Sequence, residues 1–266
     1  MIKDFSFETV ARRAGELADV RDLLPPGTRV SIPHLGGDDL AALAGAAHAV
    51  REMGFVAVPH LAARRLEAGV DLTVLRAATD QLFVVGGDPA RPEGPFPDGL
   101  ALIRSGLLAG HGFRWVGLPA YPSGHPAIDD ERLWAELAAK AAALTEQGLS
   151  AGVTLQFAGR AAVANWLAES WRRGIDLPVR VSVPGAGGIP SALAARLGLD
   201  AQEGGLLGFP AGVKLHLSPF GAVRETARLA TARAAAGSAV TGHSDSTGCP
   251  QFRHTVSVAG RAMVPA

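Results

Sequence analysis

The 266-residue chain contains a single cysteine, Cys249, so an intrachain disulfide is excluded and a reducing compartment is expected. The first residues, MIKDFSFE, include acids and lack the apolar core of a signal peptide. Glycine, proline or arginine interrupts every apolar run before it reaches the roughly 18 residues of a transmembrane helix. We therefore expect a cytoplasmic protein without a membrane partner.

A net charge is also absent, because 25 Lys and Arg residues balance 25 Asp and Glu residues. A balanced charge gives no electrostatic footprint for nucleic acid, so no nucleic-acid partner is expected. Hydrophobic residues make up 48% of the chain. A chain of this length and composition can bury a large core in one domain, and α/β barrels commonly have about 250 residues.

Eight short segments that favour β-structure alternate with segments rich in Ala, Leu and Arg. The predicted strands cover residues 3–8, 28–33, 55–60, 81–86, 113–119, 152–157, 179–183 and 212–217. Their starts lie 25 to 39 residues apart, which leaves room for the crossover that each parallel strand needs. An open doubly wound sheet is the alternative arrangement. Closure of the eight strands into a (β/α)8 TIM barrel is the simpler solution, and it is the fold we predict.

Helices are predicted around these strands over residues 9–20, 38–53, 130–147, 160–173, 190–197 and 222–236. Asp38 is a candidate N-cap, and Gly54 and Gly148 are candidate residues just beyond helix C-termini. Helical periodicity is lost near the end of the chain. We therefore expect a barrel catalytic domain over residues 1–237 and a C-terminal extension over residues 238–266, either ordered against a partner subunit or flexible.

Polar residues, glycines and prolines gather directly after the predicted strands, in the segments PHLGGDD, PHLAARR, GGDPARPEG, PAYPSGHP, LQFAGR and PGAGGIP. Glycine and proline mark turns of any kind. These segments also carry side chains that can bind ligands or move protons, namely His34, His60, Asp88, Tyr121, His125 and Gln156. In a barrel all of these segments share the C-terminal face, where active sites are built.

Five short motifs occur in the order of the strands: FSFE at 5–8, PHL at 59–61, GDP at 87–89, AYPSGHP at 120–126 and LQF at 155–157. They resemble the S-F-E, P-H-L-T, R-G-D-x-P, Y-P-E-x-H-P and T-Q-F segments of the methylenetetrahydrofolate reductase family. The dipeptide PG at 184–185 is a weaker sixth match, and the set spans residues 5 to 190. The segment KLHLSPFG at 214–221 and the tail do not match the family pattern.

The resemblance implies a role for each matching residue. Glu8 corresponds to the catalytic acid, because opening the five-membered ring of 5,10-methylenetetrahydrofolate requires protonation of a ring nitrogen. A carboxyl desolvated at a barrel mouth can stay partly protonated near neutral pH. The residues expected to bind the folate are Asp88, Gln156, Phe157 and His34. The residues expected to bind the cofactor are His60, Gly86, Gly87, Tyr121 and His125.

Each assignment has a structural alternative. Glu8 could be a surface glutamate that caps the first helix, Asp88 could stabilise its own turn, and Gln156 could be a polar residue at a strand end.

Three departures from the family concern flavin binding. Gly86 stands where the family has an arginine two residues before the aspartate of its G-D motif. Leu144 lies near the position of a lysine, with Lys140 one turn away, and Leu137 near that of an acid. Those charged groups hold FAD, so their absence should weaken its binding. The chain looks more like the flavin-independent branch of the family, in which NADH or NADPH reduces the folate directly.

Other signals are weaker. Gly185-x-Gly187 follows a strand, as in a dinucleotide-binding turn, but Pro190 stands where that turn has its third glycine. The acid that would end a strand about 20 residues later is also missing. His243, Asp245, Cys249 and His254 have metal-binding side chains without a recognised spacing, so we expect no metal site.

The sequence thus predicts NAD(P)H-dependent reduction of 5,10-methylenetetrahydrofolate to 5-methyltetrahydrofolate, or the reverse oxidation, by direct hydride transfer. The expected partner is a tetrahydrofolate derivative, and the expected state is a monomer or small homo-oligomer. An FAD-dependent reductase with altered flavin contacts is a disfavoured alternative. A non-catalytic folate-binding barrel is another.

Overall fold

Eight parallel strands form a closed barrel in the computed structural model, which describes residues 5–197 and 214–240. The strand order follows the sequence, and β1 closes the barrel by pairing with both β2 and β8. The strands are β1 (Phe5–Glu8), β2 (Arg29–Ile32), β3 (Val56–Ala62), β4 (Gln81–Val85), β5 (Trp115–Ala120), β6 (Ser150–Leu155), β7 (Val179–Pro184) and β8 (Leu215–Ser218). The predicted (β/α)8 barrel is confirmed, and the open-sheet alternative is wrong.

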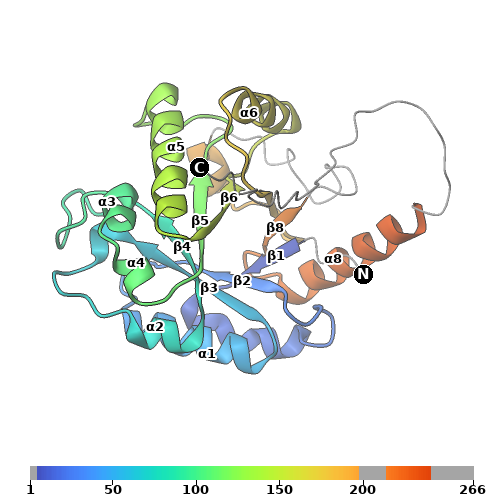
Figure 1. Ribbon diagram of the computed structural model, residues 1–266. Helices are drawn as coiled ribbons and strands as arrows, with labels where there is room; N and C mark the ends of the chain where they lie inside the picture. Colours follow the sequence, from blue (N-terminus) through green and yellow to red (C-terminus); the bar gives the residue numbers. More distant parts are fainter. Residues whose placement is uncertain (1–4, 198–213, 241–266) are drawn as a thin grey trace, which may run out of the picture.

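Helices surround the strands (Figure 1). They are the 3-10 helices η1 (Ala11–Val20) and η2 (Ala63–Arg65), and the α-helices α1 (Leu40–Glu52), α2 (Thr73–Ala78), α3 (Gly99–Arg104), α4 (Leu107–Gly110), α5 (Asp130–Glu146), α6 (Arg160–Arg172), α7 (Ser191–Leu197) and α8 (Val223–Val240). The short helices α2 to α4 were not predicted. Helix α8 runs four residues beyond its predicted end at residue 236. Residues 241–266, which hold most of the predicted extension, lie outside the described residues.

Two glycines end helices as predicted, whereas one cap is displaced by a residue. Gly54 and Gly148 have positive φ angles of 86° and 70°, which glycine adopts without strain. The N-cap of α1 is Asp39, whose side chain accepts a hydrogen bond from the backbone N–H of Ala42. The prediction of Asp38 as this cap is wrong. The Asp38 carboxylate instead accepts from the N–H of Leu35, in the turn before the helix.

The strand residues divide between two environments because side chains alternate across a strand. One set packs outward against the helices and joins the main hydrophobic core, as Phe7, Val30, Leu61, Leu82 and Val153 do. The other set faces the barrel axis, and the register of the parallel ladders brings its members side by side. Ser6, for example, pairs with both Arg29 and His216.

Aromatic rings fill one sector of the barrel interior, and two glycines make room for them. A Cβ at Gly117 would overlap the ring of Phe83, and a Cβ at Gly152 would lie 2.9 Å from Cζ2 of Trp115. The guanidinium of Arg29 lies 4.6 Å from the centroid of the Trp115 ring. We call Phe83, Trp115, Gly117 and Gly152 the aromatic sector.

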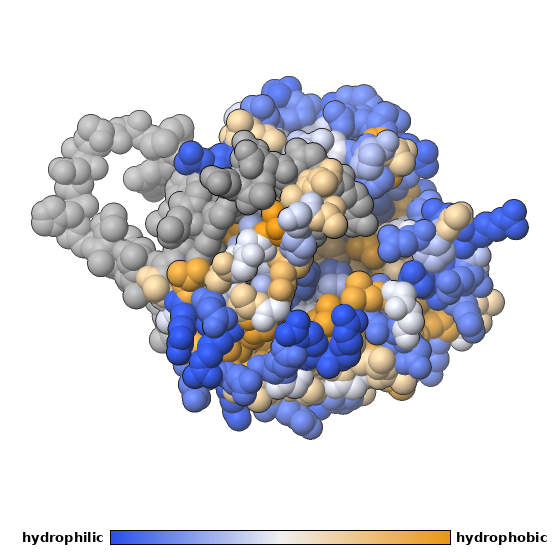
Figure 2. Space-filling view, turned by 180° about the vertical axis from the view of Figure 1, so that it is seen from behind, coloured by the Kyte–Doolittle hydropathy of each residue, from blue (hydrophilic) through white to orange (hydrophobic). Residues whose placement is uncertain are grey.

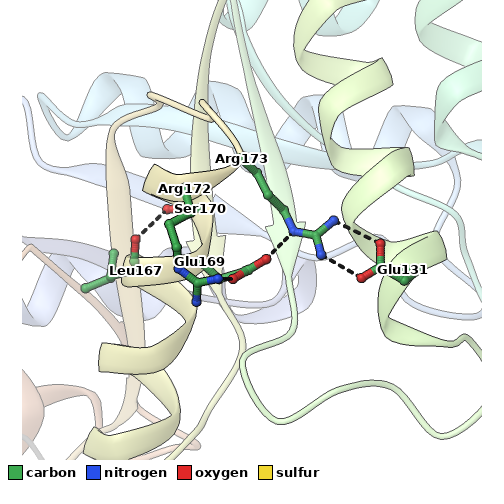
Figure 3. Close-up of polar contacts among 6 residues, drawn as sticks. All are labelled: Glu131, Leu167, Glu169, Ser170, Arg172 and Arg173. Carbon is green, nitrogen blue, oxygen red and sulfur yellow. Dashed lines mark hydrogen bonds and ion pairs between the residues drawn. The ribbon is translucent and has the colours of Figure 1, made fainter.

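Helices α5 and α6 are joined by stacked rings and ion pairs. Trp134 and Trp166 stack with centroids 5.1 Å apart. Figure 3 shows Arg173, just beyond α6, between Glu131 on α5 and Glu169 on α6. Its terminal nitrogens donate to both carboxylate oxygens of Glu131 at 2.6 and 3.0 Å.

Hydrophilic residues dominate the periphery of the face seen in Figure 2, while apolar residues gather nearer its centre. Among the residues that the structure describes, no helix combines the length and apolar character needed to cross a membrane.

Candidate active site

A carboxylate and a histidine meet inside the barrel, on neighbouring strands far apart in sequence. Glu8 ends β1, and His216 lies in β8; Nε2 of His216 is 3.3 Å from Oε2 of Glu8. The other ring nitrogen, Nδ1, is 2.9 Å from the hydroxyl oxygen of Ser6. Ser6 and His216 are register partners across the ladder, so the backbone itself brings them together. His216 is 5% exposed and Ser6 3% exposed, whereas the Glu8 side chain retains 25%.

The charge state of Glu8 differs from the sequence-based expectation. Burial raises the pKa of Glu8, but hydrogen bonding to His216, the charges of His216 and His60, and hydrogen bonding to Ser218 together lower it below its ordinary value. The expectation that desolvation keeps Glu8 partly protonated is therefore wrong for the ligand-free site. Glu8 is an ionised carboxylate there at neutral pH, next to the imidazole of His216.

His60 is the second histidine of this cluster and is neutral. Burial lowers the pKa of His60 to about 4, although the Glu8 charge acts in the opposite direction. Its ring stacks on Phe83 with centroids 4.5 Å apart. Its Nε2 atom is buried and has no hydrogen-bond partner among the described residues. A buried polar atom without a partner is costly, so His60 presents an unused donor or acceptor inside the barrel.

His34 lies beside this cluster rather than in it. Its Nδ1 accepts a long hydrogen bond of 3.4 Å from the N–H of Ala62, and its Nε2 lies 3.2 Å from the carbonyl oxygen of Asp38. Burial lowers the pKa of His34, and its charge in turn lowers that of His60. The structure thus brings His34, predicted to bind substrate, close to His60, predicted to face the cofactor.

The loop after β4 carries Gly86, Gly87 and Asp88 and is held against the end of β3. The N–H of Arg64 donates to the carbonyl oxygen of Gly86 at 2.9 Å. Gly87 has a φ of 96°, and a Cβ there would lie only 3.0 Å from Cβ of Ala62. Only glycine fits this conformation and this close approach without strain. Asp88 is exposed at the C-terminal end of the barrel, as predicted from its place after the strand.

Tyr121 and His125 follow β5 at the same end of the barrel, but they contact each other. Their rings meet edge to face with centroids 5.1 Å apart. Tyr121 lines a small cavity of about 70 Å³ that it shares with α5 and α6, and burial raises its pKa. None of the contacts described for the pair reaches Glu8, His60 or His216. The contacts in the described part of the chain thus pair Tyr121 with His125 and join neither to His60, with which the sequence had grouped them.

Gln156 and Phe157 directly follow β6. The backbone N–H of Gln156 donates to the carbonyl oxygen of Ala120, which fixes the start of this loop. The ring of Phe157 lies 5.8 Å from that of Phe220 in the loop after β8. Phe220 is 39% exposed and has a φ of 47°, a strained value for a residue other than glycine. Backbone strain of this kind is often found at ligand-binding and active sites.

Three residues of α5, Leu137, Lys140 and Leu144, lie near the positions where the family binds flavin, and all three make other contacts. Leu144 is fully buried and Leu137 is 5% exposed, both in the hydrophobic core. Lys140 forms an ion pair of 3.3 Å with Glu136 on its own helix. Neither leucine carries a charge, and the Lys140 ammonium is paired within its own helix.

Sequence reasoning missed His216, Ser6 and Phe220. The signal for His216 was present, because a histidine between two leucines in a strand faces opposite to them. The last strand of a closed barrel also lies next to the first, so an inward histidine there comes close to Glu8. No group of three or more potential metal ligands occurs among the described residues.

No protein-family model matches the chain. It is similar to a D-psicose 3-epimerase solved in the presence of D-fructose, with 11% identity and a TM-score of 0.32, over 89% of this chain and 97% of that one. It is also similar to D-psicose 3-epimerase with D-tagatose from Clostridium cellulolyticum H10, with 11% identity and a TM-score of 0.36, over 90% and 97%.

A third similar structure is a xylose isomerase-like TIM barrel/4-hydroxyphenylpyruvate dioxygenase fusion protein, with 12% identity and a TM-score of 0.34. The match covers 81% of this chain but only 31% of that one, so this chain spans about a third of the fusion protein's length. Identities and TM-scores this low identify neither a reaction nor a substrate.

Proposed function

We propose that the protein is a methylenetetrahydrofolate reductase of the flavin-independent kind, which interconverts 5,10-methylenetetrahydrofolate and 5-methyltetrahydrofolate with NADH or NADPH. The observation that carries the proposal is the position of Glu8. It lies inside the FSFE match to the family's acid segment, and its carboxylate lies in the barrel interior, 3.3 Å from the imidazole of His216. A helix-capping or surface glutamate would not be held in this way.

The reaction in the reducing direction needs one proton and one hydride. The proton goes to a ring nitrogen of the folate, so that the carbon–nitrogen bond breaks and leaves an electrophilic iminium carbon. Glu8, protonated at the moment of reaction, is the donor in this step. NADH or NADPH, when bound, supplies the hydride that this carbon accepts.

Residues on the loops hold the flat substrate above Glu8. Asp88 and the side chain of Gln156 offer an acceptor carboxylate and an amide, which match the amino and amide edge of a pterin. Phe157 and Phe220 form an apolar aromatic pair against which a planar ring can stack. His34 completes this side of the site, next to His60.

The described residues also suit a nicotinamide better than a flavin. The buried Nε2 of His60 is an unused hydrogen-bonding atom in the barrel, and a carboxamide group can satisfy it. A Cβ at Gly86 would meet nothing within 4 Å, so the backbone of the β4 loop is open to close approach there. Leu137 and Leu144 are buried in the core where the family places charged flavin ligands.

The test is an absorbance spectrum of the purified protein, followed by oxidation of NADH and NADPH with methylenetetrahydrofolate. We expect a colourless protein that is active without added flavin. Dependence on added FAD, or release of about one FAD per denatured chain, would favour the flavin-dependent alternative. Folate binding without turnover would favour the non-catalytic barrel.

A further inference from the structure

We propose that His216 carries the proton that Glu8 delivers to the substrate, so that Ser6, His216 and Glu8 act as one proton relay. This inference rests on the proposed function for the final acceptor of the proton. The relay itself is a property of three side chains in the barrel wall. It assigns a role to β8, the strand that shows no match to the family motifs.

The contact between His216 and Glu8 requires a proton between the two residues. An ionised carboxylate only accepts hydrogen bonds, so Nε2 of His216 must carry hydrogen to approach Oε2 at 3.3 Å. If Glu8 is protonated instead, the same hydrogen lies on the carboxyl and Nε2 accepts it. The two forms differ only in which heavy atom holds the proton.

Ser6 fixes the orientation of the imidazole. Its hydroxyl oxygen lies 2.9 Å from Nδ1 and can accept from an Nδ1–H or donate to a bare nitrogen. Ser6 and His216 are nearly fully buried on paired strands, so the ring has little freedom to turn away. This is the arrangement in which a histidine passes a proton through one nitrogen while the other remains bonded.

No permanent cation stabilises the Glu8 carboxylate among the described residues. The groups that act on its charge are His216 and Ser218 on β8 and His60 on β3. Of the two histidines, His60 is neutral near pH 7, because burial lowers its pKa to about 4. His216 is therefore the side chain from which Glu8 can draw a proton.

Substrate binding provides the driving force for the transfer. Burial already opposes ionisation of Glu8 and is the largest single influence on its pKa. A folate that covers the remaining exposed quarter of the side chain removes more water and favours the neutral carboxyl further. The imidazolium of His216 then gives its Nε2 proton to Glu8 and becomes a neutral imidazole with hydrogen on Nδ1, facing Ser6. Glu8 passes the proton to the folate nitrogen.

His216→Gln tests this relay, because glutamine keeps an N–H donor but cannot carry an extra proton. We expect kcat to fall by about 10- to 100-fold at pH 7.5, the effect of losing one charge-assisted hydrogen bond. KM for the folate should change much less. The decline of kcat toward alkaline pH should also begin at a lower pH than in the wild type. A loss that is equal at every pH would indicate a merely structural role and overturn the relay.

His111→Gln is the matched control, since His111 also pairs with a carboxylate, Asp71, at 3.2 Å, but at the surface. It should leave kcat and its pH profile unchanged. Ser6→Ala should shift the profile in the same direction as His216→Gln, by a smaller amount. It also serves as the second variant if His216→Gln does not fold.

A measurement without turnover separates the relay from the proposed function. The Glu8 carboxyl carbon is followed by ¹³C NMR across pH and assigned by its loss in Glu8→Gln. The pKa of Glu8 should rise in His216→Gln, because the positive charge of His216 that lowers it is gone, and should not move in His111→Gln. An unchanged pKa overturns the relay even in an active reductase. A raised pKa in a protein without reductase activity supports the proton-sharing pair and refutes the proposed reaction.

Discussion

The barrel interior has two unlike sectors. Where β1 meets β8, the inward side chains are polar and joined by hydrogen bonds through Ser6, His216 and Glu8. Across β4 to β6, the aromatic sector fills the same kind of space with two rings above two glycines. His60 links them, because it acts on the charge of Glu8 and stacks on Phe83. His60 thus lies between a polar, hydrogen-bonded sector and an apolar, closely packed one.

The largest expected effect comes from removing the proton-bearing group of the polar sector. Glu8→Gln keeps the shape of the side chain but cannot release a proton at neutral pH. Reductase turnover should fall by at least about 100-fold, the lower end of the range for general acid catalysis. Folate affinity, measured by titration calorimetry on the same variant, should change far less. A folded Glu8→Gln protein with near wild-type turnover would leave the polar sector without a catalytic role.

Gly117→Ala breaks the aromatic sector instead. The added Cβ would lie 2.9 Å from Cε2 of Phe83 and still closer to its Cδ2, so the ring must move. We expect the free energy of unfolding to fall by about 1–3 kcal/mol, the usual effect of overpacking a core. Because Phe83 stacks on His60, turnover should fall as well.

The control for that variant is Gly45→Ala, on the exposed face of α1, where a Cβ meets nothing within 4 Å. Alanine favours the helix, so stability should rise by up to about 1 kcal/mol while turnover stays the same. Equal effects of the two substitutions in chemical denaturation would mean that the aromatic sector tolerates the extra atom.

His60→Asn sharpens the link between the sectors through the pH dependence of stability. His60 binds its proton at a pKa of about 4 in the folded chain and of 6.5 as a free side chain. The unfolded state therefore binds more protons between these values, and stability falls as pH decreases through this range. The wild type should lose roughly 2 kcal/mol more than His60→Asn between pH 7 and pH 5 in urea titrations. Parallel curves for the two proteins would show that His60 is not kept neutral by burial.

The smallest effect is expected outside both sectors, at Arg173. Its ion pairs with Glu131 and Glu169 lie at the surface (Figure 3), where solvent and salt screen them. Arg173→Met should lower Tm slightly at low salt and not at all in 1 M salt, with turnover unchanged. A large, salt-independent fall in Tm would assign the main role to the contact of Arg173 with the Trp134 ring instead.

The strands were predictable because each is a short segment of β-favouring apolar residues that ends in turn residues. All eight strands begin and end within about three residues of the prediction, as β4 (Gln81–Val85) and β7 (Val179–Pro184) illustrate. Helices α2 to α4 were missed because they have six residues or fewer, and α3 and α4 also lie among several glycines. Such helices are stabilised by packing rather than by their own sequence.

The candidate site was predictable as a set of strand ends but not as an electrostatic network. A barrel mouth follows from the strand count, and Asp88 and Gln156 lie there for that reason. The lowered pKa of Glu8 depends on His216, which lies 208 positions away in the chain. The orientation of Tyr121 toward α5 and α6 likewise depends on how the helices pack, which strand periodicity does not report.

That separation of 208 residues has a consequence during synthesis of the protein. Chains grow at roughly 5–20 residues per second, so Glu8 is added to the chain about 10–40 s before His216. Until β8 arrives, β1 has an open edge and Glu8 lacks the partner that holds its proton. A truncated or stalled product that ends before residue 215 therefore lacks the proton pair altogether. The proton pair, and with it competence for proton transfer, can therefore form only after β8 has been synthesised.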